Sequence, residues 1–270
     1  MKSQTLEEPN LLQELRTSAT SRRSFLKAMG AAGLGVAAVM LLDGCGGGNS
    51  NNGGGGSFPL QNLPGNTNDQ KILNYALTLE YLEADLYRQA LNLASGKALT
   101  APLSSNPSDY TIAVSGGGLD AFNTAAGFAY LRDFAFVEAR HAQFLKTALS
   151  GVPSVSANAK GYTFGSTVAA NIKAILTAIL PLEETGVRAY LGAGQYFNDL
   201  LTLQTAVSIY STEARHSSAI NYILGIDPGP YTLAGDKLLY PIGTGVSSNT
   251  FEHFLEPATV VSAIQKFIVK

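Results

Sequence analysis

The tetrapeptide Glu-Ala-Arg-His occurs twice in this chain of 270 residues, at 138–141 and again at 213–216. In an α-helix the glutamate and the histidine of each copy lie one turn apart on the same face. Apolar residues lie one helical turn before and one turn after each copy, so we expect this face of the helix to be buried. Burying an unpaired carboxylate or imidazole costs on the order of several kcal/mol. A metal ion bound inside a helical protein would account for both copies.

The composition restricts the kind of site that the chain can build. Its only cysteine is Cys45, which excludes an internal disulfide, a cysteine-rich zinc site and a paired-cysteine redox centre. A metal site must therefore use carboxylates and histidines, which suit iron or manganese, with zinc as a further alternative. The net charge is -2 and basic residues cluster only near the N-terminus, so we expect no nucleic-acid partner.

Apolar residues at three- and four-residue spacing predict an all-α protein with four long helices and a short C-terminal one. We expect Asn68 or Asp69 to cap a first helix that runs to about residue 94, and the other expected ranges are 120–150, 168–192, 198–224 and 257–267. Residues 95–119 are rich in serine, proline and glycine, and we expect a long excursion there with a short strand at 110–114. Pro181 lies inside the third helix, where a kink is expected.

The four long helices carry an internal repeat of polar residues. The first contains Leu-Glu-x6-Tyr with Glu80 and Tyr87, and the third repeats it with Glu183 and Tyr190, while the second and fourth carry Glu-Ala-Arg-His. One glutamate from each of two helices, plus a Glu-x-x-His from each of the other two, builds a carboxylate-bridged two-metal site in a helical bundle. The two tyrosines are either hydrogen-bond donors to these ligands or simple core aromatics.

From about Leu63 to Leu224 the sequence resembles the ferritin-like superfamily, in particular the branch that includes desiccation-related proteins. The resemblance implies a left-handed four-helix bundle with one long crossover between the second and third helices, and a site for two iron or manganese ions. By motif position it implies the metal ligands Glu80, Glu138, His141, Glu183, Glu213 and His216. Glu184 is an alternative to Glu183, although the Leu-Glu-x6-Tyr repeat selects Glu183.

Other polar residues near the motifs have simpler interpretations. Glu83 is either a further ligand or a polar residue at the edge of the buried stripe. We expect Glu83, Glu184, Arg140 and Arg215 to be solvated or to form ion pairs beside the ligands. His253 stands alone in a loop-like tail, and we expect it to be exposed.

The N-terminal segment resembles a twin-arginine export signal with a lipoprotein cleavage box. Arg22 and Arg23 precede a glycine- and alanine-rich apolar run at 28–42, which ends just before Cys45. A single membrane-spanning helix is the alternative, but the run is short and interrupted by glycine. We therefore divide the chain into a signal at 1–44, a lipidated Cys45 with a flexible tether to residue 57, and the bundle domain at 58–270. We expect the mature protein to be located in the cell envelope or periplasm.

Three functions are compatible with these features. The first is an oxidoreductase that acts on oxygen or peroxide in stress defence, with a di-iron or di-manganese site. The second is metal binding without turnover, and the third is a structural bundle that protects against drying, as the desiccation-related relatives suggest. The intact ligand set favours the first two. The bundle could also form a homodimer, and its only expected contact with a membrane is the lipid on Cys45.

Overall fold

The computed structural model describes residues 56–230 and 251–270 of the chain, within a compact unit that comprises residues 55–270. Arg22, Arg23, Cys45 and the tether up to residue 55 lie outside the described residues. The helices are α4 (Asn68–Ala94), α5 (Ala121–Ala148), α6 (Ile172–Ala193), α7 (Leu200–Leu224) and α8 (Pro257–Ile264). These confirm the all-α prediction. The described residues form only isolated β-bridges, so the short strand predicted at 110–114 is wrong.

Each long helix starts at a polar side chain that accepts a hydrogen bond from a backbone N–H of the first turn, as N-caps do. The caps are Thr67, Asp120, Asn171 and Asp199. The third helix therefore begins four residues later than predicted, because residues 168–170 are not helical and Asn171 is its cap. At the other end of α7, Gly225 adopts a left-handed conformation with φ 72°, which ends the helix there.

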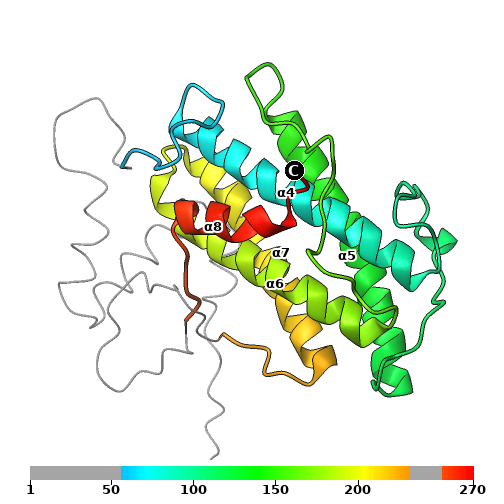
Figure 1. The fold of residues 1–270 in the computed structure, drawn as a ribbon. Coiled ribbons are helices and arrows are strands. Elements are labelled where there is room, and N and C mark those ends of the chain that lie inside the picture. The colour runs from blue at the N-terminus through cyan, green and yellow to red at the C-terminus, as the bar shows by residue number, and fades with distance from the viewer. Residues whose placement is uncertain (1–55, 231–250) are drawn as a thin grey trace, which may run out of the picture. The chain divides into compact units, whose positions relative to one another are not determined.

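The four long helices lie side by side and form a bundle (Figure 1). α4 packs most extensively against α5, and α6 packs most extensively against α7. Further contacts join α4 to α6 and α5 to α7, so all four helices surround one interior. A long crossover from Leu149 to Asn171 connects the two pairs. This arrangement brings one face of each helix to the centre of the bundle.

The C-terminal segment packs on the bundle through α8, which contacts α6 (Figure 1). The approach is close: a Cβ atom on Gly192 would lie 2.0 Å from the carbonyl oxygen of Leu255. His253 belongs to this packed segment and is only 2% exposed. The expectation that His253 is exposed is therefore wrong, because the C-terminal segment that contains it packs against α6.

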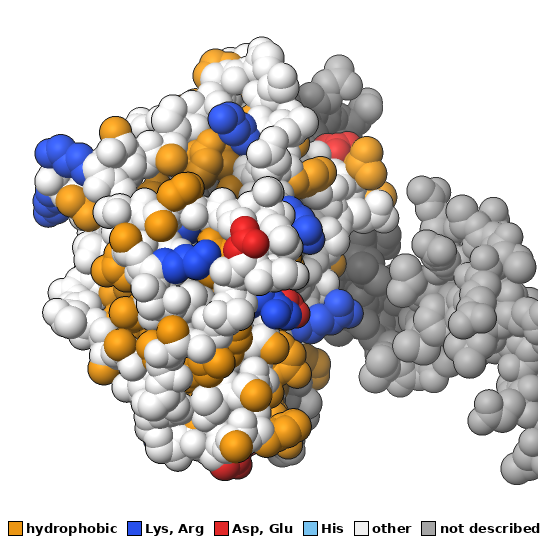
Figure 2. Space-filling model, turned by 90° about the vertical axis from the view of Figure 1, so that its right-hand side faces the viewer, with side chains coloured by type: hydrophobic (Ala, Val, Ile, Leu, Met, Phe, Trp, Pro, Cys, Tyr) orange, Lys and Arg blue, Asp and Glu red, His pale blue; other side chains and the backbone are white. Residues whose placement is uncertain are grey.

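Figure 2 shows one face of the molecule, on which lysine and arginine side chains are dispersed among apolar and uncharged groups. Across residues 56–230 and 251–270, no helix has both the length and the apolar character that crossing a bilayer requires.

Candidate metal centre

The structure brings the six predicted ligand residues together in the middle of the bundle, in two overlapping groups. One group is Glu80, Glu138, His141 and Glu213, and the other is Glu138, Glu183, Glu213 and His216. Within each group, one oxygen or nitrogen atom per residue lies within 4.8 Å of the corresponding atoms of the others. Glu138 and Glu213 belong to both groups. Their carboxylates are therefore placed to be shared between two neighbouring ions.

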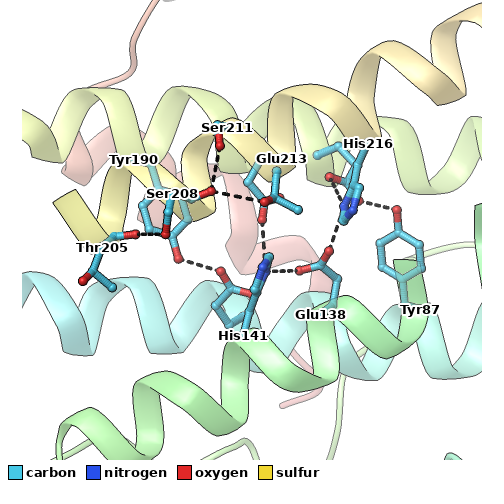
Figure 3. Close-up of polar contacts among 12 residues, drawn as sticks. Tyr87, Glu138, His141, Tyr190, Thr205, Ser208, Ser211, Glu213 and His216 are labelled. Carbon is cyan, nitrogen blue, oxygen red and sulfur yellow. Dashed lines mark hydrogen bonds and ion pairs between the residues drawn. The ribbon is translucent and has the colours of Figure 1, made fainter. Parts of the chain in front are cut away.

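Every long helix contributes to this cluster. α4 provides Glu80 and α6 provides Glu183, while α5 and α7 each provide a glutamate and a histidine three residues apart. Because three residues are close to one helical turn, the two side chains of each pair point to the same side. Figure 3 shows Glu138, His141, Glu213 and His216 facing one another, with Tyr190 and Tyr87 at opposite ends.

The two imidazoles approach the shared carboxylates through the same ring atom. His141 Nδ1 lies 2.9 Å from Glu138 Oε2, 3.4 Å from Glu213 Oε1 and 3.5 Å from Glu80 Oε2. His216 Nδ1 lies 2.8 Å from Glu138 Oε1 and 3.4 Å from Glu183 Oε2. The four carboxylates are completely buried, and the side chain of His141, 15% exposed, is the more accessible of the two histidines.

Buried polar atoms without a hydrogen-bond partner test whether these residues suit a metal ion. They include Oε2 of Glu80 and Glu183, Oε1 of Glu138, both carboxylate oxygens of Glu213, and Nδ1 of His216. The short approach of His216 to Glu138 thus lacks hydrogen-bond geometry. Buried polar groups are normally paired, since leaving one unpaired costs about 1–3 kcal/mol. Unpaired oxygen and imidazole atoms aimed at common points are the donor set that iron and manganese accept.

Burial and mutual repulsion perturb the acidities in the cluster. Burial raises the pKa of Glu80 to about 7. Burial also raises the pKa of Glu213 well above its usual value, and repulsion from the charge of Glu138 raises it further. Burial would also raise the pKa of Glu138, but its close contacts with His141 and His216 outweigh burial and lower this pKa to about 2. Burial would lower the histidine pKa values, yet the carboxylates raise that of His216 to about 9 and that of His141 further. The cluster therefore holds protons that an ion would displace.

Tyr87 and Tyr190 combine the two roles considered for them. Both rings are buried among apolar side chains, and both hydroxyls donate to a candidate ligand. The Tyr190 hydroxyl on α6 donates to Glu80 Oε1 on α4 at 2.6 Å, while the Tyr87 hydroxyl on α4 donates to Glu183 Oε1 on α6. Burial raises both phenol pKa values well above 10, so the hydroxyls keep their protons. Each tyrosine orients a glutamate across the bundle.

The neighbours Glu183 and Glu184 have different surroundings. Glu183 lies in the cluster, whereas Glu184 pairs with the fully buried Arg188 and accepts a hydrogen bond from Ser217. The ion pair lies within α6, and because Ser217 follows His216 on α7, its hydrogen bond to Glu184 ties α6 to α7 immediately beside the centre. The expectation of an ion pair beside the ligands holds for Glu184.

Glu83 is neither solvated nor at the edge of the stripe. It is buried one turn after Glu80, and burial together with the charge of Glu213 raises its pKa well above the usual value. A Cβ on Gly186 would lie 2.9 Å from Glu213 Oε2 and 3.3 Å from Glu83 Oε1. Glycine at 186 thus leaves room for both carboxylates. Arg140 and Arg215, by contrast, are exposed.

Sequence reasoning missed two features of this centre. Phe134 stacks on the ring of His216, with centroids 3.7 Å apart and planes 23° from parallel, and so fixes the imidazole. This contact joins α5 to α7, and no spacing along the chain predicts it. Gly186 had a readable signal, since an isolated glycine inside a helix often marks a close approach.

Comparison with known proteins agrees with this architecture. Residues 68–225 match the family model for a ferritin-like domain, which covers all four long helices and the whole cluster. The chain belongs to the ferritin-like domain family. No curated protein matches the sequence at a significant level. This ferritin-like domain and its carboxylate–histidine cluster fit a metal-binding bundle.

Proposed function

We propose that this ferritin-like protein holds two iron or manganese ions and carries out redox chemistry on oxygen or peroxide, in defence against oxidative stress. The observation that supports this proposal is the sharing of Glu138 and Glu213 between two ligand groups, each with its own histidine. Shared carboxylates hold two ions at short range, which suits reactions that move two electrons. A site for a single structural ion has no need of two such groups.

The residues of the chain would serve such a centre in three ways. Four carboxylates offset the charge of two divalent ions, so that the buried centre is close to neutral. Hydrogen bonds from Tyr87 and Tyr190 keep Glu183 and Glu80 in place. His141 is the histidine nearer to solvent, so a small molecule would approach on its side. When bound, the two ions would supply electrons to oxygen or peroxide, or accept them.

A turnover assay tests this proposal. Full-length protein loaded with Fe²⁺ or Mn²⁺ is mixed either with hydrogen peroxide, which can be both oxidised and reduced, or with oxygen and an excess of ascorbate as the electron donor, and consumption of peroxide or oxygen is followed with an electrode. We expect repeated turnover that Glu138→Gln abolishes and Asp133→Asn leaves intact, because Asp133 lies exposed on the same helix outside the cluster. Metal bound without consumption of either oxidant would refute the redox function and favour metal binding alone.

We also propose that the protein is exported by the twin-arginine route and anchored in the cell envelope by a lipid on Cys45. The motif at Arg22 and Arg23, the apolar run after it and the single cysteine at its end support this location. Cell fractionation tests it: Arg22→Lys/Arg23→Lys should leave the protein in the cytoplasm, and Cys45→Ala should release it from the membrane. Unchanged fractionation of both variants would contradict the proposal.

A further inference from the structure

A cavity of about 310 Å³ lies beside the metal centre, where the end of α6 meets the first half of α7. Its wall is mainly apolar and includes Tyr190, Leu191, Leu203, Ala206, Val207 and Tyr210. The cavity is open to solvent, since Val207 is 51% exposed. Its size lies at the lower end of the range for pockets that bind small organic molecules.

The lining determines which chemistry the cavity can accept. Two tyrosine rings face it, and aromatic ligands gain extra stabilisation from packing against such rings. Within residues 56–230 and 251–270, the only other polar side chain in the wall is the amide of Gln195, which can donate or accept a hydrogen bond. The wall therefore suits a molecule with an aromatic body and a polar tip.

Charged ligands would bind poorly in this cavity. Among the residues that the structure describes, no lysine, arginine, histidine, aspartate or glutamate lines the cavity, so an ion would lose hydration without meeting an opposite charge. Glu252, whose charge is after burial the second cause of the raised pKa of Tyr210, does not line the cavity and already has an interaction partner within the protein. The ligand is therefore expected to be uncharged.

One side chain joins this cavity to the metal centre. The ring of Tyr190 forms part of the cavity wall, while its hydroxyl donates to Glu80, a candidate metal ligand. A molecule in the cavity would thus lie one side chain away from the centre. We propose that this cavity is a binding site for an uncharged phenol with one or two fused rings.

The test is titration calorimetry of the full-length protein with 2-naphthol as the probe. Val207→Phe should weaken binding at least tenfold, because the added ring occupies the cavity mouth. Leu201→Phe is the matched control: Leu201 lies on the same helix, is 71% exposed and does not line the cavity, so binding should be unchanged.

Charged probes of the same shape test the chemical class. Naphthalene-2-sulfonate and 2-naphthylmethylammonium should both bind at least tenfold more weakly than 2-naphthol. The proposal is overturned if 2-naphthol does not bind, if either charged probe binds equally well, or if Val207→Phe binds like the wild type. The binding does not require metal, so the same titrations after chelator treatment separate this proposal from the redox function.

Discussion

Metal binding to this centre should release protons, and the number can be worked out from the acidities in the cluster. With a pKa of about 7, Glu80 is half protonated at neutral pH, whereas His216, with a pKa of about 9, is almost fully protonated. His141 has its pKa raised further and also carries a proton. Ligands bind metal in their deprotonated forms, so two ions should displace about 2.5 protons or more at pH 7.

This release makes the apparent affinity strongly pH-dependent. Since displacing one proton changes the affinity about tenfold per pH unit, a release of about 2.5 protons predicts a rise of about 300-fold from pH 6.5 to 7.5. Calorimetry with Mn²⁺ in two buffers of different ionisation enthalpy gives the proton count directly. Asp133→Asn, which leaves the cluster intact, should give the same count. Release of less than about one proton at pH 7 would refute the reasoning.

Three further predictions concern stability and the space around the ligands. The folded pKa of His216, about 9, lies above its ordinary value, so its stabilising contribution is complete below about pH 6.5 and disappears as the pH rises through 9. Urea unfolding of chelator-treated protein should show this decline, and a stability that rises over this range would contradict it. Gly186→Ala places a Cβ 2.9 Å from Glu213 Oε2, so it should weaken metal binding measured by calorimetry. The variant should not lose stability, because alanine favours the helix by about 1 kcal/mol relative to glycine. Unchanged metal affinity would show that Glu213 adjusts freely. Glu184→Gln removes the charged partner of the buried Arg188 and should lower the free energy of unfolding, measured in urea, by about 3 kcal/mol. A change below about 1 kcal/mol would mean that other partners of Arg188 compensate.

The parts of this protein that follow helical periodicity were predictable from the sequence. Ile72, Leu79 and Leu86 recur at intervals of seven residues on α4, and all three are buried. The limits of the long helices lie within two residues of the predicted ones, although Thr67 rather than Asn68 or Asp69 caps α4. The exception is the start of α6, where Asn171 rather than an earlier residue accepts the first-turn hydrogen bond. Local signals were sufficient because the apolar periodicity of a buried helix face and the side chains that cap its ends can both be recognised within a few residues of the chain.

Contacts between distant segments were not predictable from one sequence. The stacking of Phe134 on His216 depends on how α5 packs on α7. The burial of His253 depends on where the C-terminal segment packs on the bundle. Glu83 is an intermediate case: it follows Glu80 by three residues, so its position on the same face was readable. Its complete burial, however, depends on α6 coming close at Gly186.

The most direct test of the two-ion centre is the metal content of the full-length protein, measured by elemental analysis after reconstitution with iron or manganese. We predict about two ions per chain in the wild type and none in Glu138→Ala/Glu213→Ala, because these two carboxylates belong to both ligand groups. Circular dichroism should show that the variant remains helical. A wild type without stoichiometric metal, or a folded variant that keeps both ions, would contradict the account.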